Sequence, residues 1–223
     1  MGASLTWDGA DTKVTSSATT SLTTMTVCAW TYRTSDGESN LGRLFDKRVA
    51  GSQVMVAFNN ASQVNLELNV NFSGGIAVWR PQTNTWPTNA WTHLAFTYDN
   101  SSATNDPIFY VNGAVSALSQ DSNTTGTVST NSDAYVIGNR GSQERTFAGQ
   151  IAYFKIYDRI LTPQEILEVM QNPNSIPSGC ILYDQLLGTA DPDLSGSGNT
   201  WTYTTITDSA NGPPVFLTTA GGQ

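Results

Sequence analysis

The sequence predicts an all-β protein, a sandwich of two antiparallel sheets with one short helix near residues 162–171. Segments of strand length with alternating apolar and polar side chains recur along the whole chain, and this period of two is typical of strands with one buried face. Gly, Asn, Asp and Pro separate these segments, as they do at turns. Only one segment has the apolar spacing of a helix, so the predicted fold class is all-β.

The clearest alternation lies in residues 91–118, which are interpreted as three strands. One face of the first strand carries Leu94, Phe96 and Tyr98, and the other carries His93, Ala95 and Thr97. Residues 108–111 and 114–118 form the other two strands. Asn112-Gly113 between them supplies the two positive-φ residues of a type I′ turn, so these two strands form a predicted hairpin.

Further strands are predicted on the same grounds. They cover residues 5–7, 13–15, 25–32, 43–47, 53–58, 64–70, 76–79, 135–137, 149–157, 180–187 and 200–206. Because strands recur with no break in composition, residues 1–223 are interpreted as one domain, in which residues 176–223 supply C-terminal closing strands and a short tail. Residues 215–223 are expected to form an arm onto a neighbouring molecule.

The helix prediction depends on its first turn. Thr162 is the expected cap, Pro163 suits the first helical position, and Glu165 completes a capping box. Asn172-Pro173 ends the segment. The apolar face consists of Ile166, Val169 and Met170.

Charge and hydropathy exclude two classes of partner. The formal net charge is −8, and the 10 Lys and Arg residues are scattered along the chain. Because binding to phosphates needs clustered basic side chains, no nucleic-acid partner is expected. No run approaches the roughly 20 apolar residues of a membrane span, and no apolar leader precedes the first strand, so no membrane partner and no export signal are expected.

Several segments resemble one family. They are a Trp-x-His-x-Ala-x-x-Tyr-Asp strand that begins at Trp91, Tyr-Val-Asn-Gly at 110–113, Tyr-Val-Ile-Gly at 135–138, residues 147–151 and 157–162, and Leu-Thr-Trp-Asp-Gly at 5–9. They resemble the laminin-G-like branch of the concanavalin A-like lectin and glucanase jelly rolls, over roughly residues 3–170. The resemblance implies a concanavalin A-like jelly roll. It implies no single function, because this sandwich hosts lectins, hydrolases, adhesion modules and virion proteins.

The tail carries a further likeness to that family. Residues 193–199, Asp-Leu-Ser-Gly-Ser-Gly-Asn, resemble a segment that precedes the first strand in many members. Here the segment follows the last family-like strand. Since the two termini of such a domain lie close together, a permuted order can fill the same sheet positions.

The residues that could carry catalysis are few. The chain has no Glu-x-Asp-x-x-Glu strand of the kind that the related glucanases carry, and Glu165 and Glu168 are explained by the helix. His93 lies within a strand without a nucleophile motif, so a structural role is expected. Cys28 and Cys180 are expected to be buried free thiols, with a disulfide between them as the alternative. The protein is therefore predicted not to be an enzyme.

Calcium is the one cofactor that the resemblance implies. Asp8 and Asp11 match the family's N-terminal Asp-Gly-x-x-Asp turn, and rim carboxylates suit a hard cation. The later position that usually carries an acid is Ala152 here. The alternative is that both aspartates only form a turn.

Two loops are candidate glycan sites, because sugars need an exposed aromatic ring beside planar polar groups. Trp79, Arg80 and Trp86 surround the first loop, and Trp86 is the best candidate for an exposed ring. The second loop carries Asn139, Arg140 and Arg145. The alternative is that the tryptophans close the edge of the sandwich.

Two functions fit these observations. The first is a phage-type member of the family: an outward-facing bacteriophage virion protein, in capsid decoration or tail association, that binds host-surface glycans. It would contact other virion proteins or copies of itself and become extracellular after lysis. The low charge and the Thr- and Asn-rich composition favour this function. The alternative is a secreted bacterial carbohydrate-binding module or lectin.

Overall fold

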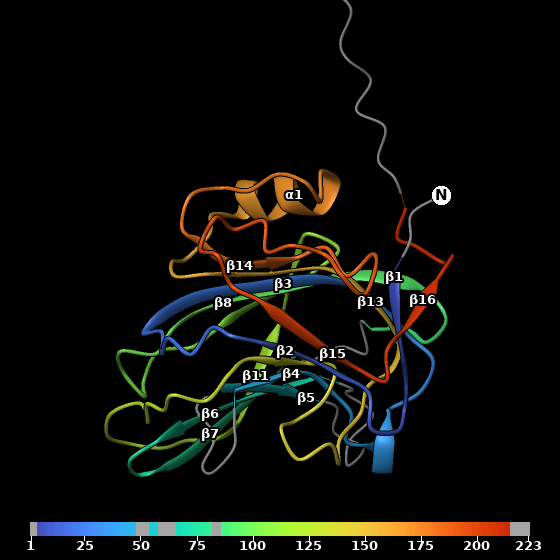
Figure 1. The fold of residues 1–223 in the computed structure, drawn as a ribbon. Coiled ribbons are helices and arrows are strands. Elements are labelled where there is room, and N and C mark those ends of the chain that lie inside the picture. Colours follow the sequence, from blue (N-terminus) through green and yellow to red (C-terminus); the bar gives the residue numbers. More distant parts are fainter. Residues whose placement is uncertain (1–3, 48–53, 58–65, 82–85, 215–223) are drawn as a thin grey trace, which may run out of the picture.

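The computed structural model describes residues 4–47, 54–57, 66–81 and 86–214. Two sheets of eight strands each face one another, every pairing within the sheets is antiparallel, and one α-helix, α1 (Pro163–Gln171), lies above one of them (Figure 1). The predicted all-β sandwich with a single helix near residues 162–171 is therefore confirmed. In the described residues, no helix has the length and apolar character that crossing a bilayer requires.

The helix-side sheet is the layer that α1 covers. Its strand order is β10 (Ala114–Ser116), β9 (Ile108–Val111), β8 (Trp91–Asp99), β3 (Thr24–Arg33), β13 (Ala148–Tyr157), β1 (Ser4–Asp8), β16 (Thr207–Ser209), and β14 (Cys180–Asp184) also pairs with β13. β13 is long enough to carry β1 along its first half and β14 along its second half, on the edge opposite β3.

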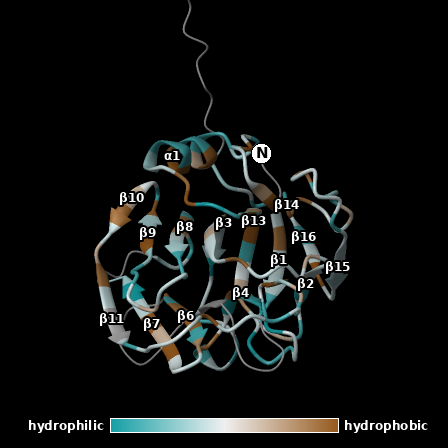
Figure 2. Cartoon of the chain, turned by 90° about the vertical axis from the view of Figure 1, so that its left-hand side faces the viewer, coloured by the Kyte–Doolittle hydropathy of each residue, from teal (hydrophilic) through white to brown (hydrophobic). Residues whose placement is uncertain are grey.

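The far sheet is the second layer. Its strand order is β11 (Leu118–Ser122), β7 (Gly75–Pro81), β6 (Glu67–Phe72), β5 (Val54–Ala57), β4 (Arg43–Lys47), β12 (Val136–Ile137), β2 (Lys13–Ser16), β15 (Trp201–Thr204). Figure 2 shows β11 and β15 at opposite sides of the molecule, with α1 over the helix-side sheet. A short 3-10 turn, Glu38–Asn40, precedes β4.

The core between the sheets is aromatic at its centre. Phe45 of β4 lies with its ring centroid 6.5 Å from Phe96 of β8, 6.1 Å from Tyr135 and 5.9 Å from Phe154 of β13. All four side chains are buried. Successive side chains of a strand point to opposite faces of the sheet, and the apolar set of each strand points into the space between the two sheets. The period of two in the sequence therefore sets which face of each sheet is buried.

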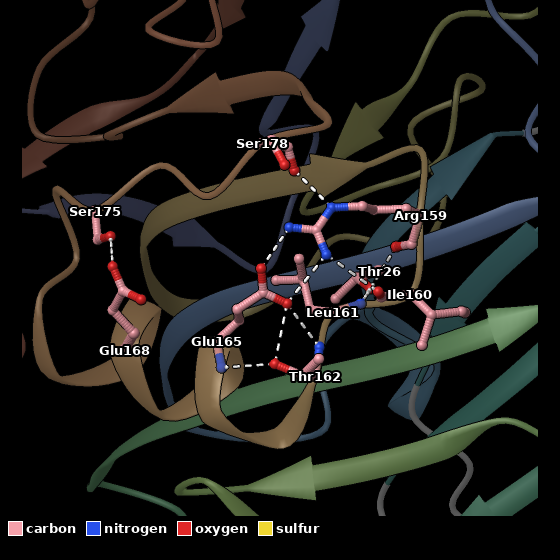
Figure 3. A network of polar contacts seen from close by, with 9 residues as sticks. All are labelled: Thr26, Arg159, Ile160, Leu161, Thr162, Glu165, Glu168, Ser175 and Ser178. Carbon is pink, nitrogen blue, oxygen red and sulfur yellow. Dashed lines mark hydrogen bonds and ion pairs between the residues drawn. The ribbon is translucent and has the colours of Figure 1, made fainter.

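The start of α1 is built as its residue types predict. Thr162 caps the helix, Pro163 follows, and Glu165 completes the capping box. The Glu165 carboxylate also accepts two hydrogen bonds from the Arg159 guanidinium, at 3.0 and 2.5 Å. Arg159 donates a further bond to the Ser178 carbonyl at 2.8 Å (Figure 3). This network fixes the angle at which α1 leaves β13.

The apolar face of α1 covers strands and a turn. The Asn112-Gly113 turn joins β9 and β10 as the predicted two-residue hairpin, with φ values of +49° and +78°. Glycine suits position 113 because its φ is +78°, and a Cβ here would also lie 2.5 Å from Leu167 Cδ2 of the helix, which would then have to move. The helix side chains that are buried against this layer are Ile166, Val169 and Met170.

A bulge in β13 places one buried cation beneath the segment that follows α1. Tyr153 has a φ of +54°, and the pairing of β13 with β3 shifts at this point. Lys155 then faces the α1 side, where its ammonium donates to the carbonyls of Pro173 and Ser175 at 2.5 and 2.8 Å. Burial lowers the pKa of Lys155. These hydrogen bonds hold the end of α1 onto the sheet.

The tail contributes strands to both sheets. The expected strands at 180–187 and 200–206 are present as β14 and β15, and β16 is an additional short strand. β14 pairs with β13, β15 with β2 and β16 with β1. The predicted arm at 215–223 lies outside the described residues.

Candidate functional site

The first predicted loop does not present its tryptophans to solvent. Trp79 is buried, and its indole N–H donates to Asp106 Oδ1 at 2.9 Å. Only 2% of Trp86 is exposed, and its ring stacks on Phe147 at a centroid distance of 6.2 Å. The expectation of an exposed Trp86 ring is therefore wrong. The physical reason is packing, because both rings fill the interior at the edge of the sandwich.

Arg80, the third residue of that loop, is bound to a neighbouring strand. Its Nη2 and Nε lie 2.9 and 3.2 Å from Glu67 Oε2 on β6. Asn69 Nδ2 donates to the other oxygen of Glu67 at 2.9 Å. The guanidinium is thus part of a largely buried polar network that joins β7 to β6.

The second predicted loop is organised around Asn139, which is fully buried. Its Nδ2 donates to the Thr12 carbonyl and to Thr146 Oγ1 at 3.1 and 2.7 Å. Its Oδ1 accepts from the backbone N–H groups of Arg140 and Arg145 at 2.8 and 3.0 Å. Asn139 therefore holds the loop together and offers no amide group to a ligand.

The two arginines of this loop have different surroundings. The Arg140 guanidinium binds Ser142 Oγ at 2.6 Å and Glu144 Oε2 at 2.9 Å, so it bonds within its own loop. Arg145 is partly exposed at the rim. The structure does not bring Arg140 and Arg145 together with an exposed aromatic ring, and their assignment to ligand binding stays a prediction.

The Asp8 and Asp11 pair forms a turn. Asp8 Oδ1 accepts from the Ala10 N–H at 2.9 Å and from the Thr12 hydroxyl, and Asp11 has a left-handed φ of +60°. Among the described residues, no group of three or more His, Cys, Asp or Glu side chains could hold a metal. Ca²⁺ takes roughly six to eight oxygens, which include backbone carbonyls and waters, so the two turn carboxylates would supply only part of a site, and their assignment to calcium stays a prediction.

Buried reactive groups are shielded beneath α1. His93 lies edge-on to Trp30 at 5.4 Å, and burial, with the nearby Lys155 charge, lowers its pKa to about 3. Cys28 and Cys180 are free thiols, as expected, but only Cys28 is buried and Cys180 is partly exposed. They lie on β3 and β14, on either side of β13, too far apart for a disulfide. Burial raises their pKa values to about 11 and 12, so neither is a nucleophile.

A hollow of a different kind lies in the tail. The chain passes from β14 in one sheet to β15 in the other (Figure 1). An open hollow of about 470 Å³ lies along this passage. Residues 189–193, residues 198–201 and Tyr203 line it, and we call it the tail depression. Trp201 and Tyr203 alternate on β15, so they share one face. Both are partly buried and pack against the core with the rest of their rings.

Asp193 fixes the loop on one side of the tail depression. Its Oδ1 accepts from the N–H groups of Tyr183 and Ser195 at 3.1 and 3.0 Å. Its Oδ2 accepts from Ser195 Oγ at 2.9 Å and from the backbone N and Nδ2 of Asn199 at 3.0 and 2.8 Å. Burial raises the pKa of Asp193, but these hydrogen bonds outweigh it and hold the pKa below its usual range. The carboxylate is therefore ionised and fully occupied.

Two further aspartates differ in exposure. Asp184, at the end of β14, is fully buried beneath Tyr203, whose hydroxyl donates to its Oδ2 at 2.9 Å. Burial raises the pKa of Asp184 to about 7, against the hydrogen bonds from Leu186 and Tyr203, which lower it. Asp191 lines the tail depression and accepts from the N–H groups of Leu187 and Gly188 through Oδ2 alone, at 2.7 and 3.1 Å.

The tail depression was not among the sites predicted from the sequence. Residues 193–199 resemble a family segment and residues 200–206 have the pattern of a strand, and neither pattern by itself indicates a ligand site. The signal that could have identified the site is Trp201-Thr202-Tyr203, two aromatic side chains on one face of a strand beside a loop rich in Asp, Ser, Gly and Asn.

The fold is that of a jelly-roll sandwich of the concanavalin A type. The chain belongs to the Laminin_G_3 family of the concanavalin A-like lectin/glucanases superfamily, whose model matches residues 8–167. The match ends within α1, so every residue that lines the tail depression lies beyond it. Curated proteins gave no match.

Two solved structures share the fold. A putative carbohydrate binding protein from Bacteroides ovatus is 19% identical with a TM-score of 0.70, over 96% of this chain and 61% of that one. A heptameric SAP-like pentraxin from Limulus polyphemus is 14% identical with a TM-score of 0.61, over 92% and 96% of the two chains. The chain thus spans about three fifths of the first of these proteins.

Proposed function

We propose that the protein is a non-enzymatic carbohydrate-binding protein that uses the tail depression as its saccharide site. The observation that carries this proposal is the pairing of Trp201 and Tyr203 on one wall with the oxygens of Asp191 and Asn199 nearby. Sugar rings stack on aromatic faces, and their hydroxyls bind planar polar groups beside them. Membership in a family of lectin-type sandwiches and the likeness to the Bacteroides ovatus protein support the same function.

The arrangement of carboxylates favours binding over cleavage. Glycoside hydrolysis needs two carboxyl groups that flank the scissile bond. Asp184 is sealed beneath Tyr203, and both oxygens of Asp193 already accept hydrogen bonds from the loop. Asp191 is then the one carboxylate in the tail depression that has an oxygen for a ligand, and a single carboxylate does not meet the requirement.

Two matched tryptophan variants test the site. Trp201→Ala removes the aromatic wall, so we expect at least about a tenfold loss of affinity for bound oligosaccharides. Trp91→Ala removes another partly buried tryptophan, which lies tilted against Tyr32 at a centroid distance of 5.7 Å and does not line the tail depression. We expect it to leave affinity unchanged. Isothermal titration against the best ligand from a glycan array measures both.

Two outcomes would contradict the proposal. Loss of binding in Trp91→Ala, with Trp201→Ala unaffected, would move the site to the Tyr32–Trp91 pair. Release of shorter oligosaccharides from a bound substrate, followed by chromatography, would show that the protein is an enzyme.

For the biological setting of this binding, we propose that the protein is exposed on a bacteriophage particle. There it would contact other virion proteins or copies of itself and bind host-surface glycans. The low share of charged residues, 13%, and the Thr- and Asn-rich composition support this assignment. Mass spectrometry of particles purified from a host lysate should find the chain. Its recovery as an exported protein without a particle would favour the alternative, a secreted carbohydrate-binding module or lectin.

A further inference from the structure

The charge of the tail depression has a single sign. Asp191 and Asp193 are the charged residues among those that line it, and no Lys, Arg or His is part of this lining in the described chain. Lys13, which pairs with Thr204 of β15, lies one position from Val14 and therefore on the opposite face of the sheet from Tyr203. Its ammonium donates to the Gly141 carbonyl at 2.9 Å. A negatively charged ligand would meet no compensating cation here.

The two carboxylate oxygens of Asp191 have different surroundings. Oδ2 accepts from the N–H groups of Leu187 and Gly188 and holds the loop. Oδ1 has no hydrogen-bond partner among the described residues, and Asp191 is part of the lining. The position of Oδ1 is thus set by the bonds of the other oxygen, which makes it a preorganised acceptor.

The neighbouring polar groups also offer acceptors. The Tyr203 hydroxyl directs its proton to Asp184 Oδ2 at 2.9 Å and lies 3.4 Å from the Asp191 carbonyl, and its oxygen can still accept a bond from a ligand. The Asn199 Nδ2 donates to the Ile181 carbonyl and to Asp193, which leaves its Oδ1 as the group for a ligand. A ligand that complements these three oxygens must carry hydrogen-bond donors.

We infer that the tail depression takes a saccharide unit that presents hydrogen-bond donors and no negative charge, and that it binds amino sugars most tightly. This inference rests on the proposed function and specifies its ligand class. A protonated amine pairs with Asp191 Oδ1 and lies against the Trp201 ring, and each contact is stronger for a cation than for a hydroxyl. Carboxylated sugars are repelled by Asp191 and Asp193.

Three oligosaccharides with the same β-1,4 linkage test the inference: oligomers of glucosamine, glucose and glucuronic acid. Titration calorimetry at low salt, below the pKa of the amine, should give the highest affinity for the glucosamine oligomer and a lower affinity for the glucose oligomer. The glucuronic acid oligomer should bind least. The differences in affinity among the three oligomers should become smaller as salt is added, because charge pairs at the surface are screened.

Asp191→Asn is the matched variant. The amide oxygen can keep the bonds from Leu187 and Gly188, while the amide nitrogen replaces Oδ1. We expect the glucosamine oligomer to lose about tenfold in affinity or more, since a charge-assisted bond is lost, and the glucose oligomer to change little. Asp208→Asn, at an exposed position of β16, removes the same charge elsewhere and should change neither affinity.

The outcomes separate the two proposals. If no saccharide binds in the oligomer series or on a glycan array, the proposed function fails. If the oligomers bind but the affinity for the glucuronic acid oligomer equals or exceeds that for the glucosamine oligomer, the proposed function stands and the inferred ligand class is wrong. An unchanged affinity of Asp191→Asn for the glucosamine oligomer would likewise overturn the inference, because Asp191 would then not set the selectivity.

Discussion

Two segments close the sandwich in different ways: α1 over the helix-side sheet, and the 185–200 loop over the edge between β14 and β15. The helix is seated by buried apolar side chains, and its polar network only directs its entry (Figure 3). The loop is anchored at its start by the buried Leu186, and beyond that point Asp184, Asp191 and Asp193 hold it through its backbone N–H groups. Apolar packing leaves no space for a ligand, whereas carboxylates that bind a loop backbone leave its outer side open.

The largest expected effect is on the helix side. Ile166 is fully buried under α1, so Ile166→Ala should lower the free energy of unfolding by about 2–5 kcal/mol through lost packing and a residual cavity. Gln164→Ala, at an exposed position of the same helix, is the control and should change stability by less than about 0.5 kcal/mol. Denaturant unfolding measures both. Equal effects would show that α1 is not seated by its apolar face.

The next largest effect is the pH dependence of stability that Asp184, at the start of the 185–200 loop, should produce. The pKa of Asp184 is about 7 in the folded protein and about 3.8 in the unfolded chain, so folding favours the protonated acid. Its contribution to stability is complete below pH 3.8 and is lost as pH rises through about 7. A shift of one pKa unit corresponds to about 1.4 kcal/mol, so Asp184 can change the free energy of unfolding by at most about 4 kcal/mol over this pH range.

In Asp184→Asn the amide oxygen can still accept from the Leu186 N–H, and the amide N–H can donate to the Tyr203 oxygen as a protonated acid would, so the variant mimics the neutral acid and removes the titration. We therefore expect wild type to lose stability relative to Asp184→Asn as pH rises from about 4 to about 8. The difference between the two proteins is the quantity to measure, because His93 acts in the opposite direction in both. The pKa of His93 is depressed, so its contribution is lost as pH falls below 6.5. A pH-independent difference would contradict the assignment.

The smallest effect concerns the helix cap. Thr162→Ala removes the side-chain oxygen that accepts from the Glu165 N–H, so stability should fall by about 1 kcal/mol. Thr162→Ser retains that oxygen and should be close to wild type. Thermal unfolding separates the two variants. Saccharide affinity should not change in either, because the cap and the tail depression lie in separate parts of the fold.

Sequence patterns predicted the sheets and the helix because their causes are local. Alternation sets strand faces, Asn112-Gly113 sets a turn, and Thr162 with Glu165 sets a helix start. Exposure of a ring is not local. Trp86 is covered by Phe147 from another part of the chain, whereas Trp201 borders a hollow that exists only because the chain changes sheets. Both tryptophans adjoin polar loops, so their neighbours in sequence could not distinguish them.

β13 carries β1 and β14 one after the other along a single edge. The opening of the chain and its tail thus act as two halves of one interrupted strand, separated at the Tyr153 bulge. A fragment cut at the end of the family match would leave Phe154–Tyr157 with unpaired backbone groups on that side. Such a bare edge is a template for pairing with a second molecule, so the tail protects the domain against aggregation through β13.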